Sequence, residues 1–127
     1  MRQALAAAAH RDDLAVPRST LCGYRLMWLM VMFDLPVETE DERKVANGFR
    51  HTLLRLGFER CQYSVYLRFC EGRQQVQTWT KRVSGNVPEG GRVYCLAFTD
   101  KQYEGLVRFE NQKRLPPPRN PGQFHLF

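Results

Sequence analysis

Asp34 is the residue of this sequence best placed to do chemistry. It follows directly on an apolar run, residues 26–33, and no other acidic residue lies between Asp13 and Glu38. A carboxylate that leaves a buried strand must meet water, a cation or a hydrogen-bond donor, because burying it unpaired is costly. Mg²⁺ accepts one or two such carboxylates and keeps most of its waters, so two copies of Asp34 across a dimer axis would form a magnesium site. The alternative is that Asp34 caps the turn before Pro36 or the start of the following helix.

A second group of polar residues lies in residues 60–66, which read Arg-Cys-Gln-Tyr-Ser-Val-Tyr. In one interpretation this segment is a strand edge that presents Arg60 and Gln62 to phosphates or to a partner chain. In the other it supplies an ordinary cross-strand polar pair among aromatic core residues. Ser64 has no base placed beside it by any motif, and the cysteines and histidines show neither metal-ligand nor nucleophile–base spacing.

The distribution of charge favours a polyanionic partner. The 127 residues have a formal net charge of +6, and residues 43–82 hold nine basic residues against Glu59 and Glu71. A basic block of this kind is typical of nucleic-acid-binding surfaces, although many solvated faces are also basic. The candidate phosphate-binding residues in this block are Arg43, Lys44, Arg50, Arg55 and Arg60.

Length and composition indicate one globular domain in the cytoplasm. Hydrophobic residues make up 43% of the chain and charged residues 25%, which is the balance of a soluble protein. The longest apolar run is far shorter than the roughly 20 residues that span a bilayer, so no membrane association is expected. The four cysteines form no CxxC pair and are expected to be reduced thiols.

Periodicity and turn signals define the elements that must position these side chains. Thr39 and Glu42 form a capping-box pattern at the start of the clearest helix, and Gly57 suits its left-handed end. The expected order is a strand at 24–34, a helix at 38–56, two strands within 58–70 with a reversal near 62–64, a helix at 74–83, a strand at 92–99 and a short strand at 107–110. This order predicts an α+β, ferredoxin-like fold, βαββαβ plus a short C-terminal strand.

The predicted domain leaves both ends of the chain outside it. Residues 1–23 are expected to be an N-terminal extension, either a disordered arm or an over-long start, residues 24–111 the ferredoxin-like domain, and residues 112–127 a Pro-rich basic tail. Both helices of this fold cover one face of the sheet, and the first strand shows no alternation that would suggest a wet second face. A homodimer packed sheet to sheet is therefore predicted.

Three stretches of the sequence resemble one known family. They are the apolar strand ending in Phe33-Asp34-Leu35-Pro36, the Arg-x-Gln-x-Ser-Val-aromatic segment from Arg60 to Tyr66, and the late strand followed by Thr99-Asp100-Lys101-Gln102. Together they resemble the second of the two universal CRISPR adaptation proteins, over about residues 25–111. The Phe-Asp-Leu-Pro and Thr-Asp-Lys-Gln versions look most like members that accompany type II systems.

The resemblance implies a ferredoxin-like homodimer in which the last strand adds to the partner's sheet. It also implies a Mg²⁺-dependent nuclease site at Asp34, with one carboxylate from each chain, and links Arg60 and Tyr66 to nucleic-acid cleavage or binding. In the adaptation complex, the dimer of this family bridges two dimers of the CRISPR integrase and supports captured double-stranded DNA along its backbone. Nuclease activity varies across the family, so the scaffold role is expected to outweigh cleavage. The alternative is a stand-alone ferredoxin-like metal-dependent ribonuclease or RNA-binding module.

Overall fold

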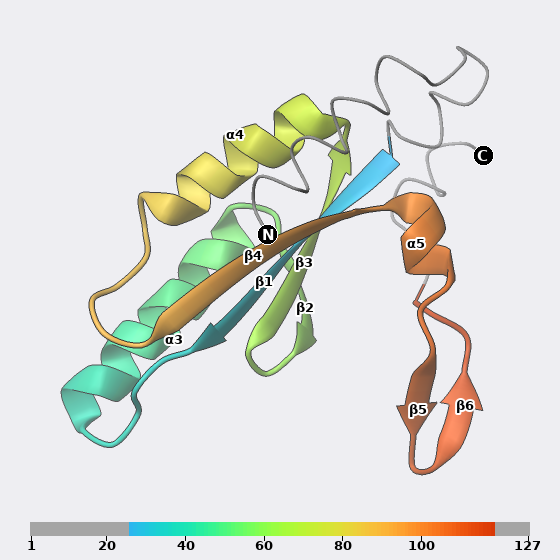
Figure 1. The fold of residues 1–127 in the computed structure, drawn as a ribbon. Helices are drawn as coiled ribbons and strands as arrows, with labels where there is room; N and C mark the ends of the chain where they lie inside the picture. Colours follow the sequence, from blue (N-terminus) through green and yellow to red (C-terminus); the bar gives the residue numbers. More distant parts are fainter. Residues whose placement is uncertain (1–25, 119–127) are drawn as a thin grey trace.

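The computed structural model describes residues 26–118 (Figure 1). The predicted N-terminal extension and the end of the predicted tail lie outside the described residues. The described part begins with a strand and ends with a small hairpin, and its elements follow the predicted order with one short helix and one short strand added. They are β1 (Leu26–Asp34), α3 (Glu40–Arg55), β2 (Glu59–Gln62), β3 (Val65–Glu71), α4 (Arg73–Ser84), β4 (Arg92–Thr99), α5 (Asp100–Glu104), β5 (Arg108–Glu110) and β6 (Lys113–Leu115).

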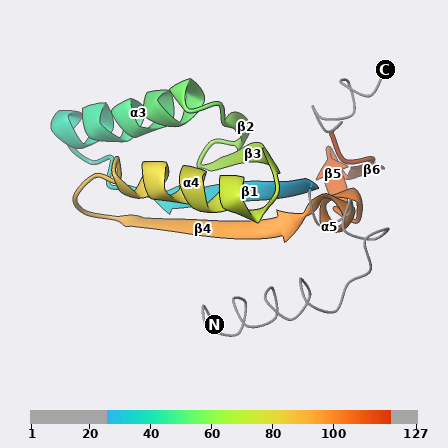
Figure 2. The ribbon, with the colours of Figure 1, turned by 90° about the horizontal axis from the view of Figure 1, so that it is seen from above.

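The four longer strands form one antiparallel sheet in the order β2-β3-β1-β4. The central strand β1 pairs with β3 on one side and β4 on the other, so the first strand of the sequence lies in the middle of the sheet. Helices α3 and α4 lie on the same side of this sheet (Figure 2). This strand order and the two helices on one face confirm the predicted ferredoxin-like α+β fold.

Helix α3 shows how local sequence sets the element that follows Asp34. The Thr39 hydroxyl accepts from the Glu42 backbone N–H at 3.1 Å, and the Glu42 carboxylate accepts from the Thr39 N–H at 2.9 Å. This reciprocal pair satisfies two N–H groups that the first helical turn would otherwise leave unpaired. Gly57 follows the helix with a φ of 88°, which confirms the left-handed end expected from the sequence.

The core lies between the sheet and the two helices. Alternate residues of β1 point into it, together with the inner faces of α3 and α4. The buried members of this core are Met27, Leu29, Val31, Phe33, Leu35, Ala46, Phe49, Leu53, Phe58, Tyr66, Cys70 and Val83. The even-numbered residues of β1 point to the opposite face, where Trp28 is buried while Met30 and Met32 are only half-buried. The first strand is therefore buried on both faces only at its beginning. Farther along, the face that carries Met30 and Met32 is only partly covered within one chain.

A short helix and a hairpin follow the sheet. Helix α5, which is not among the predicted elements, begins with a second capping box between Thr99 and Gln102. Strand β5 occupies most of the predicted short strand and pairs with β6 through a turn at Asn111 and Gln112, both with positive φ. Strand β6 lies in the segment expected to be tail, so the hairpin crosses the predicted boundary between residues 111 and 112.

Candidate nucleic-acid and metal site

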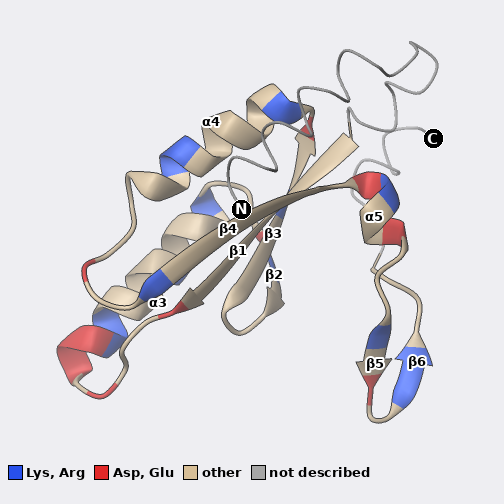
Figure 3. Ribbon diagram, viewed as in Figure 1, with Lys and Arg blue, Asp and Glu red and all other residues tan. Residues whose placement is uncertain are grey.

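Asp34 lies at the end of the central strand, on the sheet face that the helices do not cover. Its side chain is exposed, and Arg92 at the start of β4 is its partner in the strand register. Figure 3 shows an acidic residue at the end of β1 and a basic residue at the start of β4, at the same end of the sheet. Among residues 26–118, no group hydrogen-bonds or ion-pairs with the Asp34 carboxylate, so it does not act as a turn or helix cap, and Thr39 caps α3 instead.

The backbone around Asp34 is closely packed against the turn that precedes β4. A β-carbon at Gly91 would lie 2.5 Å from the Asp34 carbonyl oxygen and 2.9 Å from the Leu35 Cδ2 atom. Gly91 also has a φ of 76°, a conformation that disfavours any side chain. Leu35 is buried in the core, which holds the chain in place immediately after Asp34. The position of Asp34 is therefore set by the close approach of Gly91 and by the buried Leu35 side chain.

One chain supplies one carboxylate at this place. No cluster of three or more His, Cys, Asp or Glu side chains suited to a metal ion occurs within the described part of the chain. An exposed, unpaired carboxylate fits a hard cation such as Mg²⁺, which prefers oxygen ligands and retains water. A single chain would supply one carboxylate, and the site with two copies of Asp34 predicted from the sequence would need a second chain.

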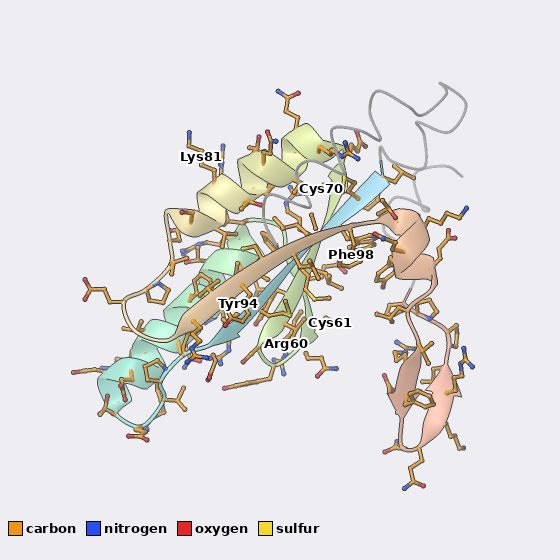
Figure 4. The ribbon with its side chains drawn as sticks, in the orientation of Figure 1. Arg60, Cys61, Cys70, Lys81, Tyr94 and Phe98 are labelled. Carbon is orange, nitrogen blue, oxygen red and sulfur yellow. The ribbon has the colours of Figure 1, made fainter. Side chains whose placement is uncertain are left out.

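The sheet face beside Asp34 is apolar and largely uncovered. Tyr94 and Leu96 of β4 have 59% and 40% of their surface exposed, and Figure 4 shows Tyr94 and Phe98 along this strand. In the register, Met32 lies opposite Tyr94 and Met30 opposite Leu96, so the half-buried methionines of β1 continue the same surface. A contiguous exposed apolar surface of this kind is typical of a protein–protein interface. We refer to it below as the open face, made of Met30, Met32, Tyr94 and Leu96.

Arg43 and Lys44, two of the candidate phosphate-binding residues, have contacts within α3 and the loop before it. Arg43 donates from Nη1 to the carbonyl oxygens of Val37 and Glu38 at 3.1 and 3.0 Å. Lys44 lies 3.9 Å from Glu40 in an exposed i,i+4 ion pair, which contributes little to stability. The structure therefore gives Arg43 a role in holding the loop after β1.

Arg50 and Arg60 come together at the β2–β3 turn. Arg50 donates from Nε to the Tyr63 carbonyl oxygen at 3.3 Å, and its guanidinium carbon lies 4.1 Å from the centroid of the Tyr63 ring. The Arg60 guanidinium carbon lies 5.4 Å from the same ring. Arg55 lies farther along α3, where it donates to the Thr52 hydroxyl. Two of the predicted basic residues thus share one exposed tyrosine.

Tyr66 is buried, although it belongs to the same motif as Arg60. Only 2% of its surface is exposed, and its ring stacks on Phe33 with centroids 5.8 Å apart. In this structure the ring packs in the core beneath the Asp34 end of β1 and offers no surface to a ligand. Its place in the motif is thus explained by packing within one chain.

The thiols of the described residues are poor nucleophiles. Burial raises the pKa of Cys61, Cys70 and Cys95, partly offset by the nearby Arg108 at Cys61 and by Arg68 at Cys70. A raised pKa leaves little thiolate at neutral pH, and thiolate is the reactive form. All three cysteines are free. Asp34 therefore remains the best candidate for chemistry in this part of the chain.

Comparison with known proteins agrees with the three motifs. The family model described as CRISPR associated protein Cas2 matches residues 27–105, which include Asp34, the β2–β3 turn and α5. The chain belongs to the Cas2 family. A protein of Paracidovorax avenae named CRISPR-associated endoribonuclease Cas2 is 53% identical over 107 residues, which cover 84% of this chain and 99% of that protein. Proteins of the same name from Flavobacterium psychrophilum and Parvibaculum lavamentivorans are each 40% identical, over 82% and 80% of this chain and 90% and 100% of theirs.

Sequence patterns alone assign no functional role to Gly91, Tyr63 or Arg92, which lie at the same end of the sheet as the Cas2-type aspartate. The Gly90-Gly91 pair is the local signal that points to Gly91, because glycine is favoured where φ is positive. Nothing local indicates that Tyr63 and Arg50, on different elements, share a contact.

Proposed function

We propose that this Cas2-family chain is a subunit of the CRISPR adaptation machinery, a homodimer that bridges integrase dimers and holds captured duplex DNA. The observation that carries the proposal is the position of an exposed, unpaired carboxylate, Asp34, at the margin of the open face. Two chains packed through their open faces would cover Tyr94 and Leu96 and bring two copies of Asp34 toward one axis. The free cysteines suit a cytoplasmic protein. None of the helices in residues 26–118 is long and apolar enough to cross a membrane.

The basic residues of α3 and the β2–β3 turn would contact phosphates in this proposal. Arg50, Arg55 and Arg60 keep donors that their internal hydrogen bonds do not use, since a guanidinium has five N–H groups. Binding through phosphates is independent of base sequence and weakens steeply with salt. Holding a captured duplex regardless of its sequence needs contacts of this kind. The Phe-Asp-Leu-Pro and Thr-Asp-Lys-Gln segments lead us to place the protein with type II systems.

A Mg²⁺-dependent phosphodiesterase activity is the second part of the proposal, and the name endoribonuclease given to the relatives favours it. Asp34 and its copy in the second chain would hold the ion, which when bound activates water and neutralises charge on the phosphate. Arg60 would orient the phosphate from the β2–β3 turn. A stand-alone ribonuclease working without an integrase is the competing function.

The substitution Asp34→Asn tests both parts of the proposal, since it keeps the shape of the side chain and removes its charge. We expect Mg²⁺-dependent cleavage of RNA or DNA to be lost, while duplex binding in EDTA and co-purification with the neighbouring integrase are retained. Spacer integration that survives Asp34→Asn would support the scaffold role. Loss of integration with intact binding would instead show that cleavage is the biological activity, and failure to bind either the integrase or duplex DNA would refute the proposal.

A further inference from the structure

The β2–β3 turn presents an exposed aromatic ring with two guanidinium groups nearby. Tyr63 has 60% of its surface exposed, whereas the residues usual in such turns are small or polar. Arg50 reaches it from α3 and Arg60 from β2, at 4.1 and 5.4 Å from guanidinium carbon to ring centroid. Arg60 lies at this turn in Figure 4. We call Arg50, Arg60 and Tyr63 the turn cluster.

The turn cluster is held in a defined geometry. The Arg50 Nε hydrogen bond to the Tyr63 carbonyl oxygen fixes the turn to α3, and Arg50 Nη1 donates to the Asn47 Oδ1 atom at 3.1 Å. The Arg50 guanidinium also lies 5.4 Å from the Phe33 ring of β1. Because these contacts order the arginine and the turn before any ligand arrives, binding there would lose less conformational entropy.

The turn cluster lies at the same end of the sheet as Asp34. The Phe33 backbone N–H donates to the Ser64 carbonyl oxygen at 3.0 Å, so the residue after Tyr63 contacts the residue before Asp34. A strand of nucleic acid bound at the turn would therefore lie at the end of the sheet that carries Asp34.

From this arrangement we propose that the turn cluster binds an unpaired nucleotide, with the base stacked on Tyr63 and the adjoining phosphate paired with Arg50 and Arg60. A nucleotide presents both an anion and an aromatic face, whereas an acidic peptide would use the arginines and leave the ring unoccupied. The bases inside a duplex are stacked on each other, so the interior of a duplex offers no free face to Tyr63. The inference rests on the proposed nucleic-acid-binding function and adds to it a preference for single-stranded segments.

The test compares Tyr63→Leu, Tyr63→Phe and the unchanged full-length chain for binding to a fluorescent oligo-dT, an oligo-U and a blunt DNA duplex, all in EDTA. Stacking on one aromatic side chain contributes enough that Tyr63→Leu should weaken single-strand binding about 5- to 100-fold. Tyr63→Phe keeps the ring and should bind within about twofold of the unchanged chain, since only the hydroxyl is lost. Duplex binding should be the same for all three proteins. The oligo-dT and oligo-U arms distinguish DNA from RNA as the source of the nucleotide.

A photocrosslink gives a readout that a merely structural role of Tyr63 would not produce. An oligonucleotide carrying 5-iodouracil should crosslink to a stacked tyrosine, and trypsin cleavage after Arg60 and Arg68 would recover the adduct on residues 61–68. Fragmentation within that peptide should place it on Tyr63 and not on the buried Tyr66. Single-strand binding unchanged in Tyr63→Leu, or an equal loss on the duplex, would overturn the inference. If the unchanged chain binds duplex but no single strand, the inference fails alone, and if it binds neither, the proposed function fails with it.

Discussion

The contact between Gly91 and Asp34 allows a pair of nearly matched substitutions. Gly90 and Gly91 are neighbours with almost the same φ, 78° and 76°. A β-carbon at Gly90 would meet only the Pro36 Cγ atom at 3.8 Å, an ordinary van der Waals contact. A β-carbon at Gly91 would lie 2.5 Å from the Asp34 carbonyl oxygen, which backbone geometry does not tolerate. Gly90→Ala and Gly91→Ala therefore share the backbone penalty and differ in the collision.

The expected loss of stability follows from the backbone penalty and from the collision. An alanine with left-handed φ costs about 1–2 kcal/mol relative to glycine, partly offset by about 0.4–1 kcal/mol from the smaller entropy of the unfolded chain. Gly90→Ala should therefore lower the free energy of unfolding by about 1 kcal/mol. Forcing an extra methyl into a packed site adds about 1–3 kcal/mol, because the backbone must move. Gly91→Ala should exceed Gly90→Ala by that amount, and the movement should displace Asp34 and Leu35.

Urea unfolding at a fixed protein concentration measures this difference, because the stability of a dimer depends on concentration. The dependence of ΔG on urea should be unchanged in both variants, so that the shift in midpoint reports stability alone. If Asp34 holds Mg²⁺, Gly91→Ala should also raise the Mg²⁺ concentration needed for half-maximal cleavage, whereas Gly90→Ala should not. Equal stability of the two variants, within about 0.5 kcal/mol, would refute the reasoning that Gly91 positions the end of β1.

Three further predictions concern the dimer, the core and the response to pH. Leu96→Lys should raise the dimer dissociation constant at least about 100-fold, because it buries a charge in the open face. The control Leu54→Lys, at a 48% exposed position on α3, should leave the dissociation constant unchanged in analytical ultracentrifugation. Equal effects of the two substitutions would count against the open face as the interface. Trp28→Phe removes the indole N–H that donates to the buried Asp100 carboxylate at 2.9 Å, and thermal or urea unfolding should show a loss of about 1–3 kcal/mol; no loss would mean that this hydrogen bond is energetically neutral. Burial raises the pKa of the Cys70 thiol in the folded protein. The protonated thiol therefore contributes fully to the free energy of unfolding below the pKa of the unfolded thiol, about 8.5, and this contribution is lost as the pH rises through the folded pKa. Urea titrations at pH 8 to 10 should accordingly show a falling free energy of unfolding, with a shallower fall in Cys70→Ala, and parallel curves would contradict this cause.

The local sequence determined the elements and the place of Asp34. The capping box at Thr39 and the apolar stripe of α3 depend on residues three or four apart, so they can be read without knowing the fold. The long apolar run of β1 marks a central strand, because both its edges pair with other strands and one of its faces packs in the core. The order of these elements then predicted the ferredoxin-like sheet, and the motifs at its strand ends predicted the family.

Only the tertiary structure decided which motif residues reach the surface. Arg60 and Tyr66 face each other in the β2–β3 register, yet Arg60 is exposed on an edge strand and Tyr66 packs under α3. Pairing of β1 with β4 brings Gly91 against Asp34, and packing of α3 on the sheet brings Arg50 onto Tyr63. These contacts join residues distant in the chain, so they depend on how the elements pack and not on any local pattern. The sequence thus determined that a carboxylate ends the central strand, and tertiary packing decided what surrounds it.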